Sequence, residues 1–196
     1  MSHRLLADAR FHRALLSIDD ELAAEAGSRG CGVCGARLHV ADYPRKPRGE
    51  PPGLEEEWSR RHSFCCSADG CRKRLTPTSV RFLDGRVYTG VVVVLAAVLA
   101  QGLSGKRLKI LRESVGVDRR TLERWRRWWT EELPRTELWS ELRGRFDRPV
   151  LEGGLPTSLL ERVQGADEEE RLLRLLRLLE PISHSACMRS RFARVA

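Results

Sequence analysis

Five of the six cysteines in this chain lie between residues 31 and 71, and their spacing is that of metal ligands. One pair is Cys31-x2-Cys34, and the second group is Cys65-Cys66-x4-Cys71. Two tight turns, each carrying two cysteines, supply the four thiolates that a tetrahedral zinc ion binds. The first residues do not resemble a secretory signal, so we expect a cytoplasmic protein, which does not readily keep disulfides. Metal binding therefore explains this spacing better than disulfide bonds do.

The third metal ligand is either Cys65 or Cys66. Neighbouring residues on a strand point to opposite faces, so only one of the two is expected to reach the metal. The stretch CSADGC (residues 66–71) resembles the wide second turn of the zinc ribbons in phage late-gene activators. That resemblance favours Cys66 and implies that Cys65 is a packed thiol. His62 is a further candidate, but a solvated histidine on a strand is the preferred interpretation.

The predicted ligands are therefore Cys31, Cys34, Cys66 and Cys71, and the predicted cofactor is a structural Zn²⁺ ion. A catalytic zinc keeps one coordination position open for water and needs a general base beside it. Four thiolates close the site, and their negative charge makes the metal a poor Lewis acid. We expect the metal to hold the ribbon together and to take no part in a reaction.

Basic residues follow the second group of cysteines directly. Residues 31–86 carry eleven basic and seven acidic side chains, in a chain whose net charge is +8. The basic residues at the exit of the ribbon are Arg72, Lys73 and Arg74, followed by Arg81 and Arg86. Such groups suit phosphates better than catalysis, so we expect a basic strand that contacts DNA beside a second DNA-binding element.

That second element is the segment from Leu108 to Arg127, which fits the pattern of a helix-turn-helix. It lies in residues 103–130, which carry nine basic and three acidic side chains. If Gly116 is the glycine of the turn, the five positions where the two helices touch must be apolar. The residues at those positions are Leu111, Val115, Val117, Leu122 and Trp125. Arg112 departs from the pattern, since a small residue is usual there.

The second helix of this unit is predicted to present basic side chains to DNA. Asp118 can cap its N-terminus, and Val117 can pack on Leu122 across that cap. If the helix lies in the major groove, its arginines can read guanine edges and hold phosphates. The expected contacts are Arg119, Arg120, Thr121, Arg124 and Arg127, with Glu123 on the same face. The alternative is a solvated basic helix in an ordinary bundle. The pattern of Trp125, Trp128 and Trp129 is that of core or cap residues, not of base-stacking groups.

The whole pattern predicts a mostly α-helical protein with a small β zinc ribbon. Its segments are an N-terminal helix (1–30), the ribbon with a proline-rich loop (31–86), a three-helix helix-turn-helix unit (87–131) and C-terminal helices with an irregular tail (132–196). The apolar helix at about 88–101 is too short for a bilayer and is expected to shield its two neighbours. The leucine-rich helix Arg171–Glu180 either packs on the protein's own body or forms a homodimer.

A family resemblance rests on the ribbon together with GVDRRTLERWRR (residues 116–127). Over residues 31–130 the chain resembles the N-terminal DNA-binding half of insertion-sequence transposases and small transposon-associated bacterial proteins. The latter share YPRKPRG (43–49) and RHSFCC (61–66). The resemblance implies sequence-specific binding of element ends or operator-like sites. The transposase catalytic domain needs three separated carboxylates that hold two metal ions, and the 66 residues after Thr130 are too few for it.

The sequence therefore predicts a zinc-stabilised protein that binds double-stranded DNA and is not an enzyme. We expect a transposon-associated accessory factor or a transcriptional regulator, without a membrane partner. One alternative is a protein–protein adaptor whose ribbon binds a transposase or polymerase. Another is a remnant of a transposase that has lost its catalytic domain. RNA binding is a weaker alternative, because no platform of aromatic side chains for base stacking is visible.

Overall fold

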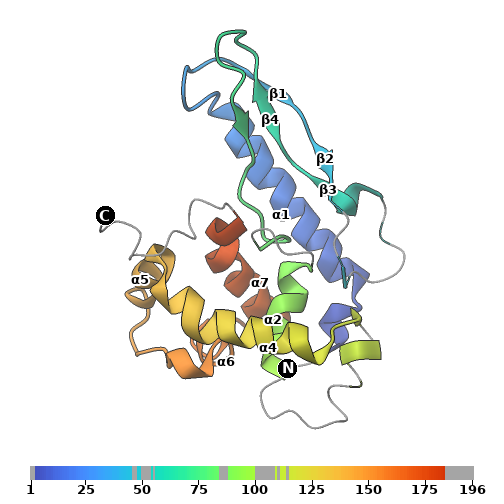
Figure 1. The fold of residues 1–196 in the computed structure, drawn as a ribbon, viewed down its shortest axis with the longest axis vertical. Coiled ribbons are helices and arrows are strands. Elements are labelled where there is room, and N and C mark those ends of the chain that lie inside the picture. Colours follow the sequence, from blue (N-terminus) through green and yellow to red (C-terminus); the bar gives the residue numbers. More distant parts are fainter. Residues whose placement is uncertain are drawn as a thin grey trace.

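The computed structural model describes residues 3–45, 48–49, 54, 56–83, 88–99, 109, 111–113 and 115–183. Within these residues the protein is mostly helical and has a small antiparallel sheet, as predicted. Figure 1 shows two parts, which we call the arm and the body. The arm consists of the long helix α1 and the paired strands, and the body consists of the other helices.

The α-helices that the structure describes in full are α1 (Ala9–Ser28), α2 (Gly90–Leu99), α4 (Arg119–Arg127), α5 (Glu137–Arg143), α6 (Thr157–Leu160) and α7 (Glu168–Leu179). Short 3-10 turns lie between or beside them: η1 (His3–Leu6), η2 (Glu56–Ser59), η4 (Leu133–Arg135), η5 (Glu152–Gly154) and η6 (Glu180–Ser183). A π-helical turn, η3 (Trp128–Glu132), continues α4. The strands are β1 (Leu38–Val40), β2 (Tyr43–Pro44), β3 (Arg60–Arg61), β4 (Phe64–Cys66) and β5 (Arg74–Leu75).

The strands of the arm form one bent hairpin with a short third strand. β1 pairs antiparallel with β4, and β2 pairs antiparallel with β3. Between these two ladders the N–H of Ala41 donates to the carbonyl of Ser63 at 2.8 Å, which makes the hairpin continuous. β5 pairs with the other edge of β4, so that the sheet order is β1-β4-β5. This register sets Leu38 opposite Cys66 and brings the two groups of cysteines to one end of the hairpin.

Helix α1 runs along the hairpin and connects it to the body (Figure 1). The apolar spacing of the first residues predicts a single helix beginning near residue 3. The structure instead has the turn η1 followed by α1, because the carboxylate of Asp8 accepts a hydrogen bond from the N–H of Arg10 at 2.9 Å and caps a new helix. Phe11 and Leu15 are buried in the body, and Ala23 is buried in the arm. The protein has one hydrophobic cluster in the body and a smaller one in the arm, and α1 contributes to both.

The larger hydrophobic cluster contains side chains from all four of the segments predicted from the sequence. Helix α2 lies at its centre and packs against η1, α4 and α7, with residues 90–97 buried. Trp125, Trp128 and Trp129 are buried there, as predicted for core tryptophans. No helix among the residues described here has the length and the apolar character needed to cross a membrane.

Helix α7 buries its leucines in the protein's own body. Leu172, Leu175, Leu176 and Leu179 are fully buried, and α7 packs against α2 and α6. This confirms the prediction of intramolecular packing. A homodimer through the Arg171–Glu180 helix gains no support from this arrangement, because these four leucines are already covered.

A buried ion pair joins the middle of α1 to the chain that leaves the ribbon. Asp19 Oδ2 accepts a hydrogen bond from Arg81 Nε at 2.7 Å, and neither side chain is exposed to solvent. Ser79 Oγ also donates to Oδ2, and the N–H of Val80 donates to Oδ1 at 2.8 Å. The other two guanidinium nitrogens of Arg81 donate to backbone carbonyls of η2 and β3. These hydrogen bonds compensate for the loss of hydration of both charges.

The expectation that Arg81 belongs to an exposed basic strand is therefore wrong, because its guanidinium is buried against Asp19. Arg86, expected on the same strand, lies outside the described residues. The position of Arg81 makes it a structural residue that connects the arm to the body.

We predict that Asp19→Ala lowers the free energy of unfolding by about 3–5 kcal/mol, because it leaves the charge of Arg81 buried without a partner. Urea denaturation followed by circular dichroism measures this change. The control is Asp20→Ala on the next residue, whose carboxylate is 58% exposed and pairs with His62 at 2.8 Å. An exposed pair of this kind contributes less than about 1 kcal/mol. Equal losses in the two variants would contradict the role assigned to Asp19.

Candidate metal centre and nucleic-acid interface

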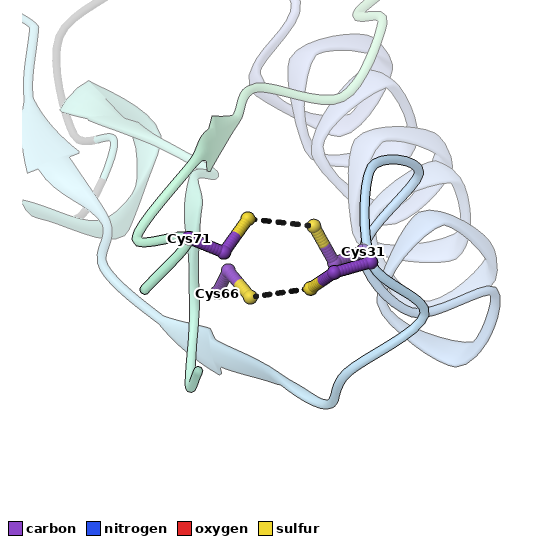
Figure 2. A group of neighbouring side chains, drawn as sticks. Cys31, Cys66 and Cys71 are labelled. Carbon is purple, nitrogen blue, oxygen red and sulfur yellow. Dashed lines mark hydrogen bonds between the residues drawn. The ribbon is translucent and has the colours of Figure 1, made fainter. Parts of the chain in front are cut away.

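Two turns of the chain bring four cysteine sulfur atoms together at the tip of the arm. The Sγ atoms of Cys31, Cys34, Cys66 and Cys71 all lie within 4.8 Å of one another. Figure 2 shows the side chains of Cys31, Cys66 and Cys71 directed toward a common point. The Sγ–Sγ distance is 3.7 Å for Cys31–Cys71 and 3.4 Å for Cys34–Cys66. Metal–sulfur bonds of about 2.3 Å in a tetrahedron require sulfur atoms about 3.8 Å apart, so this group is able to hold one metal ion.

The first turn depends on a left-handed backbone immediately after Cys34. The N–H of Gly35 donates to the carbonyl of Cys31 at 2.8 Å, and the N–H of Cys31 donates to the carbonyl of Ala36 at 2.9 Å. Gly35 has a φ of 72°, a conformation that a residue with a side chain rarely adopts. Gly32, in the same turn, does not have a positive φ. The conformational freedom of glycine is thus needed at Gly35.

The second turn also has a left-handed backbone after its last cysteine, but the residue there is not a glycine. The N–H groups of Cys71 and Arg72 both donate to the carbonyl of Ala68 at 3.0 Å. Arg72 follows the last cysteine, as Gly35 does in the first turn, and its φ is 47°. The backbone conformation that closes each turn is therefore shared, and it places strain on Arg72.

Backbone N–H groups point at the sulfur atoms and favour their ionised form. Hydrogen bonds from Val33 and Cys34 lower the pKa of the Cys31 thiol to about 6. The hydrogen bond from Ala68 acts in the same direction on Cys66, but burial and the neighbouring thiols outweigh it and raise the pKa of Cys66 to about 12. The first thiol to ionise thus opposes ionisation of the others. A cation among the four sulfur atoms removes this conflict, which makes the donor set suited to a metal.

The cysteine group rests on a small hydrophobic cluster of its own. The buried side chains of this cluster are Ala23, Cys31, Leu38, Phe64 and Cys66. It contains residues of α1, β1 and β4, so the cysteines lie where the end of α1 meets the hairpin. A metal held by all four sulfur atoms would have no coordination position left for a substrate. The arrangement suits a structural site.

Cys65 does not belong to the group. It neighbours Cys66 on β4, and its half-buried Sγ lies 3.7 Å from the carbonyl oxygens of Cys66 and Arg72. Strand alternation separates the two thiols, as the sequence predicts. The residue brought to the other three cysteines is Cys66, which the resemblance to phage activators also favours.

His62 also lies away from the sulfur atoms, and its partly exposed ring contacts two carboxylates. Its Nε2 is 2.8 Å from a carboxylate oxygen of Asp20 on α1, and its Nδ1 is 3.4 Å from a carboxylate oxygen of Asp42. The ring therefore connects the hairpin to α1. The sequence does not indicate these contacts, because Asp20 precedes His62 by 42 residues and no local pattern links them.

The basic residues predicted at the exit of the ribbon are exposed at the tip of the arm. Arg72, Lys73 and Arg74 are all exposed, and Arg72 forms an ion pair with Asp69 at 2.8 Å. Figure 1 shows that the tip of the arm lies far from α4 in the body. These residues are therefore not beside the second basic element, contrary to our expectation.

The second basic element has a helical turn on each side of Gly116. Residues 109, 111–113 and 115 are helical, and Gly116 has a φ of 66°. The carbonyl of Gly116 accepts a hydrogen bond from the hydroxyl of Tyr88 at 3.1 Å. Asp118 caps α4 by accepting a hydrogen bond from the N–H of Thr121 at 2.7 Å, which lowers the pKa of Asp118. The five apolar positions are all buried: Leu111, Val115, Val117, Leu122 and Trp125.

Helix α4 exposes arginines on the side opposite its buried residues. The exposed ones among the predicted DNA contacts are Arg119, Arg120, Arg124 and Arg127. Arg119 pairs with Glu123 on the same face at 2.8 Å. The expectation that Thr121 faces DNA is wrong, because its side chain is only 8% exposed. Its role is in the cap, where its backbone binds Asp118.

In comparisons with protein-family models, curated proteins and solved structures, the chain has no significant match. The likeness to transposases therefore rests on the cysteine spacing and the residues around Gly116 alone. Function has to be argued from the two exposed basic surfaces and the cysteine group.

We predict that Gly35→Ala lowers the free energy of unfolding of the metal-loaded arm by about 1–2 kcal/mol, because the new Cβ must adopt a left-handed backbone. Gly32→Ala in the same turn is the matched control, since no atom lies within 4 Å of its Cβ position. Thermal unfolding of both variants measures the difference. A Gly32→Ala protein as unstable as Gly35→Ala would show that the backbone conformation is not the cause.

We also predict that Cys66→Ser abolishes metal binding, whereas the protein with Cys65→Ser keeps about one metal ion per chain. Mass spectrometry of the metals in the purified proteins measures this. If Cys66→Ser does not fold, titration of metal release from the Cys65→Ser protein still shows whether Cys65 is a metal ligand. Loss of the metal on Cys65→Ser would overturn the assignment.

Proposed function

We propose that this chain is a zinc-stabilised protein that binds double-stranded DNA, acting as a transposon-associated accessory factor or a transcriptional regulator without catalytic activity. The exposed arginine face of α4 carries this proposal. The cysteine group supports the zinc, and the surface of the arm supports a second contact.

Zinc is the metal we propose because four thiolates in a tetrahedral arrangement are its usual structural ligands. Hard cations such as Mg²⁺ and Ca²⁺ prefer oxygen ligands, which this group lacks. Cys31, Cys34, Cys66 and Cys71 would hold the ion. Its contribution is to fix the end of the hairpin against α1.

The arginines of α4 are suited to a DNA groove because the helix is rigidly held from behind. Leu122 and Trp125 are buried in the body, and Trp125 packs edge-to-face on Tyr88 with ring centroids 5.1 Å apart. The arginines that project away from this packing are Arg119, Arg120, Arg124, Arg126 and Arg127. Guanidinium groups on a helix can bind guanine edges and phosphates from the major groove. A merely solvated helix would not require this one-sided concentration of arginine.

Salt dependence of binding to duplex DNA tests the proposal. We predict that the affinity of the zinc-loaded protein falls steeply with salt concentration, because phosphate contacts release counterions. Arg120→Ala combined with Arg124→Ala should weaken binding by about tenfold or more and reduce the salt slope by about two. Fluorescence anisotropy with a labelled duplex measures both quantities.

The matched control removes the same charge elsewhere. Arg135 and Arg143 are exposed and lie outside α4, so Arg135→Ala combined with Arg143→Ala should leave most of the affinity unchanged. Binding that is absent, insensitive to salt, or equally reduced by both double variants would refute DNA binding through α4. If the protein binds duplex DNA as proposed, selection of bound sequences from random duplexes identifies the preferred site.

A second candidate function is that of an adaptor, in which the arm binds a protein partner. Val33 and Val40 are 70% and 71% exposed on the arm, which is unusual for apolar side chains of this size. The distance of the arm from α4 leaves this surface free for another molecule (Figure 1). Val33→Ser with Val40→Thr should abolish co-purification of a specific protein from nuclease-treated cells and leave duplex binding intact. Co-purification that persists in this variant, together with loss of duplex binding, would exclude the adaptor function.

A further inference from the structure

The C-terminal part of the body contains a cavity in which five of the eleven lining residues are arginines. Its volume is about 570 Å³, and it lies between the segment after α5, the end of α6 and the helix α7. These three segments meet in the body, away from the tip of the arm (Figure 1). The lining arginines are Arg145, Arg148, Arg162, Arg174 and Arg177. Neither the cysteine group nor the exposed face of α4 accounts for this site.

Composition alone does not explain why the arginines gather here. Residues 131–196 carry eleven basic and twelve acidic side chains, so this region has no basic excess. Five of the eleven nevertheless line one cavity, together with only two carboxylates, those of Asp147 and Glu161. Like charges placed around one cavity repel one another unless an anion offsets them. The cavity is therefore suited to an anionic ligand.

Three of the five arginines are available to such a ligand. Arg174 pairs with Glu170, and Arg177 lies 3.8 Å from a carboxylate oxygen of Glu21. The remaining three are Arg145, Arg148 and Arg162; all are exposed, and none forms a side-chain hydrogen bond or ion pair with a residue in the described part of the chain. Their planar guanidinium groups can each donate two parallel hydrogen bonds to a phosphate.

The cavity also has an apolar side. Its apolar lining residues are Val163, which is buried, and Phe146 and Leu178, which are half-buried. A volume of about 570 Å³ falls within the range of small-molecule sites, about 300–1,000 Å³. An aromatic ring beside phosphate-binding arginines suits a ligand with both a flat apolar group and phosphates.

We propose that this cavity binds a nucleotide, with its phosphates held by Arg145, Arg148 and Arg162 and its base against Phe146. The nucleotide is either free in solution or a unit of a nucleic-acid strand, and the experiment separates these two sources. The site is independent of duplex binding through α4.

Isothermal titration calorimetry with three probes tests the chemistry: ATP, tripolyphosphate and adenosine. We expect ATP to bind, tripolyphosphate to bind more weakly, and adenosine not to bind. Arg148→Ala and Arg162→Ala should each weaken ATP binding by about tenfold, because each removes a charged hydrogen-bonding partner of a phosphate. Arg135→Ala, which removes an exposed arginine outside the cavity, is the matched control. Circular dichroism checks that the variants are folded.

The same titrations in the Arg120→Ala, Arg124→Ala protein remove the contribution of α4. ATP affinity should be unchanged there, so that failure of duplex binding and failure of this proposal are distinguishable. A short single-stranded oligonucleotide that displaces ATP and binds more tightly identifies a strand as the source; one that does not displace it identifies a free nucleotide. The proposal is overturned if ATP does not bind at millimolar concentration or if adenosine binds equally well. It is equally overturned if the Arg148 and Arg162 variants keep full affinity, or if polyglutamate binds more tightly than ATP.

Discussion

Four sulfur atoms within 4.8 Å of one another are the constraint on which the arm depends. Ionised thiols at this spacing repel, and the pKa of Cys66, raised to about 12 by burial and its neighbours, expresses that conflict. The proposed Zn²⁺ ion resolves it, because thiolates that repel one another are each attracted to the metal. The hydrophobic cluster beneath has only five buried residues, which is too small a core to hold a hairpin by itself. On the proposal that the four cysteines bind zinc, the metal contributes more to stability at this end of the molecule than apolar burial does.

The cysteine group is connected to the rest of the protein through α1. This helix contributes Ala23 to the cluster beneath the cysteines and Leu15 to the main core. Between them Asp19 holds the buried guanidinium of Arg81, and Asp20 binds His62 of the hairpin. The arm is thus fixed to the body at several points along one helix. The tip of the arm, with exposed Arg72, Lys73 and Arg74, lies far from α4, so the two basic surfaces are separate (Figure 1).

Local patterns predicted much of the site, and long-range contacts accounted for what was missed. Cysteine spacing and strand alternation narrowed the group to Cys31, Cys34, Cys71 and one of Cys65 and Cys66, and the resemblance to phage activators favoured Cys66. The turn pattern around Gly116 located five buried apolar positions. The same local logic failed for Arg81, since its partner Asp19 lies 62 residues away and a single arginine carries no sign of it. It failed for Thr121 because a helical position near a cap can face either the core or solvent. Counting charges along the sequence does not show whether a basic residue lies on the surface, because that depends on the fold.

X-ray absorption at the zinc edge of the purified protein shows whether the four cysteines bind zinc. We expect four sulfur ligands at about 2.3 Å and no nitrogen or oxygen ligand, with the same spectrum in the Cys65→Ser protein. A spectrum with one or more nitrogen or oxygen ligands, or a correctly folded arm that contains no zinc, would refute a structural zinc site of four cysteines.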